Sequence, residues 1–169
     1  MSDGSLTVDG WTILAHPMFL GQLETMIGAV ETARAKDPEG YGKKRAAKLL
    51  AAVFEVAFED IPGDPAREAY RQGAAPGEDR KHWFRAKFLQ QFRLFFRYRQ
   101  SAGAKIIILA WANDESTLRA YQSASDVYAV FRKMLKRGTP PDDWSALYES
   151  CRDPVAQLRL RKASGAQDD

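Results

Sequence analysis

Apolar and charged residues alternate along a short segment in the middle of the chain. Phe84, Ala86 and Phe88 fall on one side of an extended backbone, whereas Arg85 and Lys87 fall on the other. Successive side chains of a strand point to opposite faces of a sheet. The alternation therefore predicts a strand with one apolar face and one cationic face.

The same alternation returns over residues 92–99, after a break of three residues. One face is again apolar, and the other carries three arginines and one aromatic ring. The apolar face consists of Phe92, Leu94, Phe96 and Tyr98, and the cationic face consists of Arg93, Phe95, Arg97 and Arg99. The two segments together predict a two-stranded ribbon whose cationic face includes one exposed aromatic side chain.

Two further strands are expected on either side of this ribbon in sequence. The run Lys105–Trp111 is apolar almost without interruption, which is typical of a strand that is buried on both faces at the centre of a sheet. The segment Trp11–His16 predicts a short strand, and Pro17 ends it.

The segments between these strands have helical periodicity. Apolar residues recur at three- and four-residue steps from Met18 to Val30 and again over residues 49–58, where Ile61 and Pro62 end the pattern. Residues 36–42 contain glycine and proline breakers. The two helices are therefore expected to form an antiparallel hairpin.

Two more helices are expected after the central strand. Asn113, Asp114 and Ser116 are residue types that cap helix N-termini, and helical spacing follows over residues 127–135. A last helix is expected over residues 142–161.

This order of elements predicts an α+β fold, with a helical hairpin packed on a mostly antiparallel sheet of about four strands and with C-terminal helices. The length of 169 residues suits one domain. We expect that domain to span residues 11–161, after a flexible lead-in over residues 1–10 and before a disordered tail over residues 162–169.

Charge changes the interpretation of the ribbon. The chain carries a formal net charge of +3, but residues 80–105 contain eight lysines and arginines and no aspartate or glutamate. A cationic face with an aromatic ring suits a polyanion with bases that can stack, so RNA or DNA is the first candidate ligand. A protein whose basic face binds an acidic partner segment is an alternative.

The amino-acid composition indicates the expected cellular location and cofactor content. Cys151 is the single cysteine, so no intrachain disulfide is possible and a reducing cytoplasm is the expected location. The longest apolar run, residues 106–112, is too short to span a membrane. No cluster of Asp, Glu and His suggests a metal site, so no cofactor is expected.

Four long motifs resemble those of one protein family. They are FRLFFRY at residues 92–98, ILAWANDE at 108–115, TLRAY at 117–121 and KMLKRG at 133–138. In this order and spacing they are similar to the YhaV toxins, the toxin half of the PrlF–YhaV type II toxin–antitoxin systems within the RelE-like ribonuclease superfamily. The resemblance runs from Trp11 to Trp144, with departures at residues 73–82, at 89–91 and in the C-terminal tail.

The resemblance implies a RelE-like fold and a ribonuclease that inhibits translation and growth. It also implies an antitoxin partner of the PrlF type, an RNA substrate that is either free or ribosome-bound mRNA, and binding of the toxin–antitoxin complex to operator DNA. The alternative from the residues themselves is a nucleic-acid-binding regulator without catalysis, because the basic face suits both.

Cleavage of RNA without a metal requires a base for the ribose 2′-OH, positive charge for the phosphorane and an acid for the leaving 5′-oxygen. Arg85, Lys87, Arg93 and Arg97 share one face of adjacent predicted strands, so several of them are expected to meet one phosphate. A lysine that is desolvated among arginines gives up its proton more readily, which makes Lys87 a candidate base.

In RelE-like ribonucleases the site is commonly built from strand arginines and lysines, with an arginine and a tyrosine near the last helix. By motif, the resemblance assigns Arg93 as the strand arginine and Arg119 and Tyr121 as the later pair. Arg93 and Arg119 would stabilise charge on the phosphate, and Lys87 or Tyr121 would transfer protons, with Arg85 adding neighbouring charge. Further RNA-binding candidates are Arg97, Arg99, Phe95, Lys133, Lys136 and Arg137.

Some of these residues have an equally simple structural explanation. Phe95 either stacks on a base or is covered by a C-terminal helix. Lys133, Lys136 and Arg137 fit the C-terminal end of a helix, where cations meet the negative end of the helix dipole. His16 is expected to be a hydrogen-bonded structural residue, and His82 is a weak candidate for an acid or base.

Overall fold

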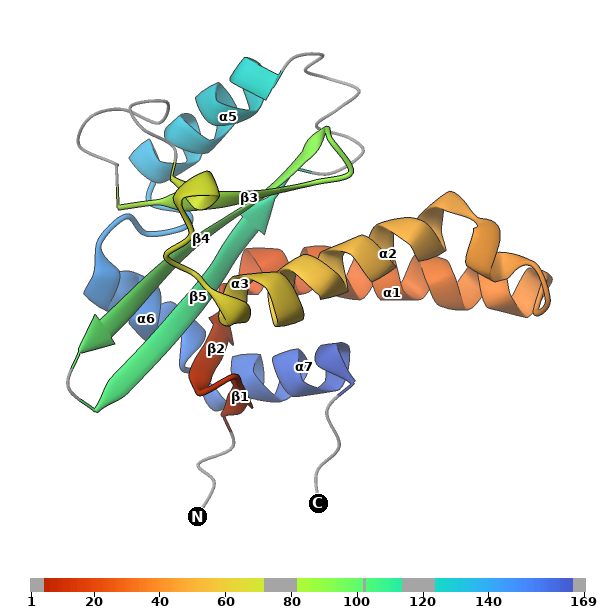
Figure 1. The fold of residues 1–169 in the computed structure, drawn as a ribbon, viewed down its shortest axis with the longest axis horizontal. Helices are drawn as coiled ribbons and strands as arrows, with labels where there is room; N and C mark the ends of the chain where they lie inside the picture. Colours follow the sequence, from red (N-terminus) through yellow and green to blue (C-terminus); the bar gives the residue numbers. More distant parts are fainter. Residues whose placement is uncertain (1–4, 72–81, 102, 114–123, 166–169) are drawn as a thin grey trace.

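The computed structural model describes residues 5–71, 82–101, 103–113 and 124–165 (Figure 1). Its centre is one sheet of five strands in the spatial order β1-β2-β5-β4-β3. The strands are β1 (Leu6–Val8), β2 (Trp11–Ala15), β3 (Phe84–Phe88), β4 (Phe92–Ser101) and β5 (Ala104–Ala112). The expected α+β architecture is confirmed, with one strand more than predicted.

The pairing of the strands explains why β5 is the most apolar. It lies between β2, to which it is parallel, and β4, to which it is antiparallel. Strands β3 and β4 pair antiparallel with Lys87 opposite Arg93, which confirms the predicted two-stranded ribbon. The additional strand is β1, which pairs with β2 through a turn at Asp9 and Gly10, both with positive φ. The expectation that residues 1–10 form a flexible lead-in is therefore wrong for Leu6–Val8.

The predicted helical hairpin is confirmed. Helix α1 (Pro17–Lys36) is followed by a 3₁₀ turn (Tyr41–Lys43) and by α2 (Arg45–Glu55), which continues through a π-helical turn (Val56–Asp60) into α3 (Ile61–Gly63). A second 3₁₀ turn (Glu68–Tyr70) comes before the gap at residues 72–81. His16 caps α1, because its Nδ1 accepts a hydrogen bond of 3.1 Å from the Met18 amide, so its predicted structural role is confirmed.

The C-terminal part contains α5 (Ala124–Lys136), α6 (Trp144–Cys151) and α7 (Pro154–Ser164). The single helix expected over residues 142–161 is therefore two helices. Pro154 has no amide hydrogen for a continuing helix, and the Asp153 carboxylate caps a new one by accepting from the amides of Val155 and Ala156 at 3.1 and 3.3 Å. Helix α7 reaches Ser164, so the tail expected from residue 162 begins as helix.

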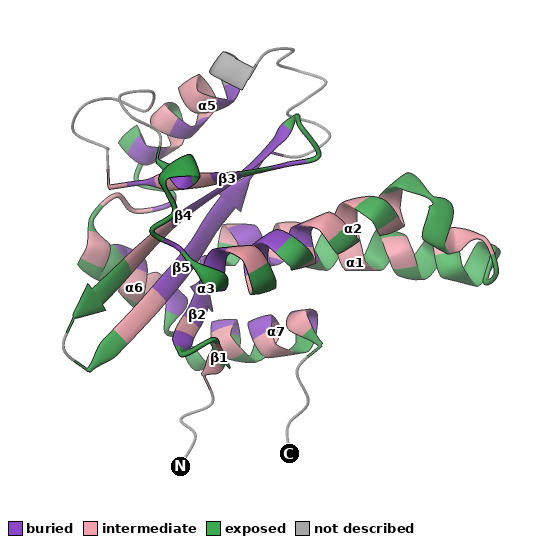
Figure 2. Ribbon diagram, in the orientation of Figure 1, coloured by how far each residue is buried: buried purple, intermediate pink, exposed green. Residues whose placement is uncertain are grey.

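Helices cover both faces of the sheet (Figures 1 and 2). On one face, the α1–α2 hairpin and α7 pack against apolar side chains that include Leu94, Phe96 and Leu109. On the other, α5 and α6 pack against Phe95, Ile108 and Trp111. The face that the sequence predicts to be cationic and exposed is thus partly covered by α5 and α6. None of the helices in the described ranges is long and apolar enough to cross a membrane.

Candidate functional site

Helix α5 covers the middle of the face that carries the arginines. Phe95 is completely buried there. Its ring stacks on Phe131 of α5 with centroids 4.2 Å apart, and it also lies against Trp111 at 5.8 Å. Phe95 is therefore part of the core, and in this position its ring is not exposed for stacking on a base. Of the two open interpretations, cover by a C-terminal helix is the correct one.

Arg85 lies at the rim of α5, half-buried on the edge strand β3. Its Nε donates a hydrogen bond of 2.6 Å to the Tyr128 hydroxyl on α5, and its Nη1 donates one of 2.6 Å to the Ala69 carbonyl. A guanidinium has five N–H groups, so these two bonds leave about three for a ligand. The side chain is thus held from two sides and still offers donors to an anion.

Arg93 is placed differently from the other strand arginines. It is only 7% exposed, and its Nη1 donates to the main-chain carbonyls of Gln90 and Phe92 at 3.0 and 3.3 Å. Its Nε is buried without a hydrogen-bond partner. The guanidinium therefore folds back onto the turn between β3 and β4 and supports that turn.

Asn113 fixes the same turn from the end of β5. It is 2% exposed. Its Oδ1 accepts from the Arg93 amide at 2.6 Å, and its Nδ2 donates to the Gln91 carbonyl at 3.0 Å. The sequence suggests Asn113 as a helix cap, but both ends of its side-chain amide are engaged by the β3–β4 turn instead.

Lys87 stands opposite Arg93 in the strand register and is exposed. A lysine acts as a base more readily when its ammonium group is desolvated, and Lys87 is exposed to solvent. The sequence also leads us to expect that several cations of this face contact one phosphate. In the structure the arginine side chains do not converge on one point. Arg85, Arg93 and Arg97 each have hydrogen-bond partners of their own, and the Phe95–Phe131 stack lies among them.

Arg97 and Arg99 lie against the rings of Trp83, which precedes β3, and Trp144, which begins α6. The Arg97 guanidinium carbon lies 5.6 Å from the Trp83 ring centroid and 5.2 Å from that of Trp144, and the guanidinium carbon of Arg99 lies 4.5 Å from Trp144. Burial lowers the pKa of Arg97, and the nearby Asp142 carboxylate opposes that shift. Arg99 is exposed, so it is the more accessible of the two.

Asp142 connects this group to the start of β3. One carboxylate oxygen accepts from Trp83 Nε1 at 2.7 Å and lies 2.9 Å from His82 Nε2, while the Asp142 main-chain carbonyl accepts from Arg97 Nη1 at 2.8 Å. The side chains of His82 and Asp142 are each 35% exposed. The arrangement anchors β3 to the segment before α6, and a proton-transfer role for His82 stays a prediction.

The remaining sequence candidates lie at one end of α5 or outside the described residues. Lys133, Lys136 and Arg137 are exposed at the C-terminal end of α5, where the helix dipole alone accounts for them. Arg119 and Tyr121 fall within residues 114–123, which the structure does not describe. Among the described residues, no group of three or more His, Cys, Asp or Glu side chains could hold a metal ion.

Comparison with known proteins identifies the family. A family model described as a toxin with endonuclease activity, of a toxin–antitoxin system, matches residues 13–152. The chain belongs to the YhaV toxin family. The ribonuclease toxin YhaV of Escherichia coli strain K12 is 49% identical to it over 142 residues, which are 83% of this chain and 91% of the relative. The toxin YhaV of Escherichia coli O6:H1 is 48% identical over 142 residues, which are again 83% of this chain and 91% of the relative. No solved structure matches the chain.

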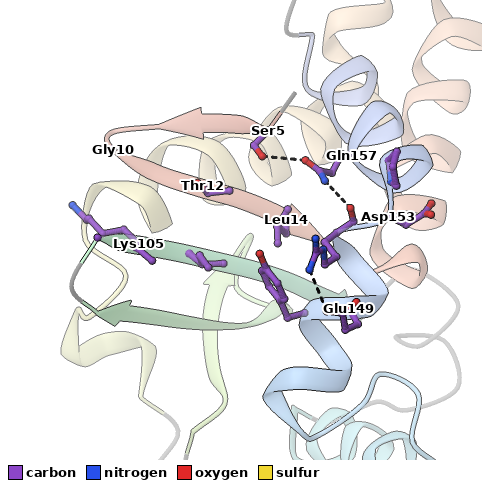
Figure 3. A pocket seen from close by; sticks show the side chains of 14 residues that line it. Ser5, Gly10, Thr12, Leu14, Lys105, Glu149, Asp153 and Gln157 are labelled. Carbon is purple, nitrogen blue, oxygen red and sulfur yellow. Dashed lines mark hydrogen bonds and ion pairs between the residues drawn. The ribbon is translucent and has the colours of Figure 1, made fainter. Parts of the chain in front are cut away.

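A cavity of this YhaV-family chain is lined by residues of β2, β5, α6 and α7 (Figure 3). It has a volume of about 850 Å³ and lies along β2 and β5, which β4 separates from the edge strand β3. Its polar side chains largely satisfy one another: Ser5 donates to Gln157, and Gln157 donates to the Arg152 carbonyl. Lys105 at its rim lies over the Trp11 ring. None of the strand arginines Arg85, Arg93 and Arg97 is among the described residues that line this cavity.

The sequence of this YhaV-family chain does not indicate that three further residues contact the arginines of the candidate site. Tyr128, Asp142 and Trp144 each contact an arginine of β3 or β4. They come from helices or loops at least 43 residues away from Arg85 in the chain. The DVYAVF segment around Tyr128 has ordinary helical spacing, so only the packing of α5 on the sheet reveals that Tyr128 reaches β3.

Proposed function

We propose that this chain is the ribonuclease of a toxin–antitoxin pair, that it cleaves RNA without a metal ion, and that it thereby inhibits translation and growth. The family model describes endonuclease activity, and the 49% identical relative is named a ribonuclease toxin. The chain spans 91% of that relative. The cytoplasm, where RNA is translated, is the proposed site of action.

The observation that carries the proposed site is the contact between Arg85 and Tyr128. A tyrosine hydroxyl that accepts from a guanidinium at 2.6 Å keeps its own hydrogen for a second partner. The pair therefore presents a positive charge and a proton donor side by side at the rim of α5. Phosphoryl chemistry needs both, because negative charge develops on the phosphorane and the leaving oxygen must be protonated.

We assign Arg85 to the phosphate oxygens and Tyr128 to protonation of the leaving 5′-oxygen. The ribose 2′-OH attacks the adjacent phosphorus, the bond to the 5′-oxygen breaks, and the products are a 2′,3′-cyclic phosphate and a 5′-hydroxyl. Arg119 and Tyr121, which the resemblance to RelE-like ribonucleases suggests, complete the proposal as a second cation and a proton acceptor for the 2′-OH. Arg93 supports the turn that ends β3 and begins β4.

Cleavage of purified RNA by the purified toxin tests this site. We expect cyclic phosphate and 5′-hydroxyl ends in the presence of a chelator. We expect Arg85→Ala to lower the cleavage rate by about 100- to 1,000-fold, which is the usual effect of removing one preorganised hydrogen-bond donor from an enzyme active site. We expect Tyr128→Phe to lower the rate by about 100-fold.

Arg34→Ala is the matched control, because it removes one exposed arginine from the far end of α1. It should cleave like wild type. Ends that carry 5′-phosphate and form only with magnesium would overturn the metal-free mechanism. RNA binding without any cleavage by wild type would favour a non-catalytic regulator.

The partners follow from the same family. We propose an antitoxin of the PrlF type and, for the complex, binding to operator DNA of its own operon. Co-purification of the tagged toxin with the protein encoded beside it tests the first proposal. A gel-shift experiment with the operon's upstream DNA, with and without the antitoxin, tests the second.

A further inference from the structure

An apolar groove lies on the face of the sheet opposite to Arg85. It has a volume of about 830 Å³ and runs between the α1–α2 hairpin and the strands β3 and β4. Met26, Leu49, Phe88 and Phe92 contribute its larger apolar side chains. A smaller cavity of about 360 Å³ continues it past Leu49 and Phe92 toward the β3–β4 turn. In Figure 1 the α1–α2 hairpin extends away from the sheet.

The polar side chains in the floor of this groove are already hydrogen-bonded within the protein. Gln22 uses both ends of its amide on the Ala112 backbone, at 2.6 and 3.1 Å. Thr25 donates to the Gly21 carbonyl, and Asn113 bonds the β3–β4 turn. The floor therefore has little to offer to a polar ligand such as a nucleotide, and it favours apolar side chains.

The rim has the opposite character and is cationic. Lys43, Arg45 and Lys48 line the smaller cavity, and all three are exposed. No acidic residue occurs in the sequence between Glu39 and Glu55, and the described residues that line the two cavities include none. An occupant with negative charge beside its apolar side chains matches this combination.

The dimensions suit a helix. Helix α2 has 11 residues and is therefore about 16 Å long, which accommodates about three turns of a partner helix. Small side chains on both walls, Ala29 and Ala46, allow such a helix to come close. An amphipathic helix that lies in a groove of this kind is anchored by apolar side chains three, four and seven residues apart.

The turn at the mouth of the groove also presents an apolar side chain. Leu89 is 51% exposed and lines the smaller cavity. Leu89 and Gln90 both have positive φ, 47° and 63°, a conformation that is costly for residues other than glycine. The protein thus holds a leucine in solvent beside the groove, in a turn that its backbone does not favour.

We infer that this groove binds an acidic amphipathic helix of the antitoxin, on the face of the sheet away from the RNA site. The inference rests on the proposed function, because it takes the partner from the toxin–antitoxin pair. The apolar side chains of the antitoxin helix would lie on Met26, Leu49 and Phe92, and the carboxylates of that helix would face Lys43 and Lys48. Antitoxin binding at the groove and RNA cleavage at Arg85 are then separable by mutation.

The test measures the affinity of the purified cognate antitoxin for the full-length toxin by calorimetry. We expect the double variant Lys43→Glu/Lys48→Glu to bind about 10- to 100-fold more weakly, since like charges then meet across the interface. Ala29→Trp should weaken binding by a similar factor, because an exposed alanine on α1 becomes a ring that fills the groove. Both variants should cleave RNA like wild type.

The control is Arg34→Glu/Lys36→Glu, which changes the net charge by the same amount at exposed positions in the last turn of α1. It should change the affinity by less than about threefold. Wild-type affinity in both groove variants would overturn the inference. The inference would also be overturned if wild type forms a dimer that the groove variants dissociate and if their antitoxin affinity stays unchanged. The groove would then bind a second copy of this chain. Failure of wild type to cleave RNA would instead overturn the proposed function, and the affinities would still decide the groove.

Discussion

Replacement of Phe95 distinguishes a core residue from an RNA contact. Its ring is fully buried between Phe131 and Trp111, with centroids at 4.2 and 5.8 Å. Truncation to alanine should lower the free energy of unfolding by about 3–5 kcal/mol, which is the usual cost of removing a buried phenylalanine. For a protein of this size that corresponds to a decrease in Tm of about 6–20 °C. Phe95→Leu, which keeps much of the volume, should cost about 1–2 kcal/mol.

Urea unfolding followed by tryptophan fluorescence measures these changes, with RNA affinity measured separately at temperatures where each variant is folded. Phe54→Leu on α2 is the control, because Phe54 is only half-buried, and it should cost less than about 1 kcal/mol. Folded Phe95→Leu should bind RNA like wild type. A variant that keeps the unfolding free energy of wild type and loses RNA affinity would show that Phe95 contacts the ligand and is not a core residue.

Three further predictions concern buried polar groups. Asn113→Ala should lower the free energy of unfolding by about 2–4 kcal/mol in urea titrations, since the buried Arg93 amide loses its acceptor and the Gln91 carbonyl its donor; an unchanged midpoint would contradict the role of Asn113 in the turn. Burial lowers the pKa of His16 below its ordinary value of 6.5, so the stability associated with neutral His16 is complete above pH 6.5 and is lost as the pH falls through the lower, folded-state pKa. Wild type should therefore lose stability relative to His16→Asn, which retains a capping side chain, as the pH falls below 6.5, and parallel pH profiles would argue against this. Burial raises the pKa of Cys151 to about 12, so at pH 8 its thiol should react with a disulfide reagent only in denaturant, and rapid reaction of the native protein would show that α6 opens.

Local periodicity in the sequence is sufficient to predict most elements of the fold. The period-two segments at residues 84–88 and 92–99 form β3 and β4, and the doubly apolar run that contains Ile107 is the central strand β5. These predictions succeed because side-chain parity in a strand is a local property. Two of the differences in extent, at Leu6–Val8 and at Pro154, concern a short edge strand and a helix break, which depend on turn and cap chemistry rather than on periodicity.

The candidate site is much less accessible to sequence reasoning. Strand parity places Arg85, Phe95 and Arg97 on one face, and the structure confirms that placement. Parity does not say what covers the face. Helix α5 buries Phe95, and the β3–β4 turn takes up the guanidinium of Arg93. Both effects are tertiary, so a pattern of alternating residues identifies a candidate surface but cannot choose among its arginines.

The most direct test of the central claim compares RNA cleavage by wild type, Arg85→Ala and Arg85→Lys under identical conditions, with circular dichroism to establish that each variant is folded. Lysine keeps the charge but cannot donate to both the Tyr128 hydroxyl and the Ala69 carbonyl in the same fork geometry. Both variants should lose at least about 100-fold in cleavage rate while their unfolding transitions stay cooperative. Folded Arg85→Ala protein that cleaves RNA at the wild-type rate would contradict the assignment of Arg85 to the phosphate oxygens.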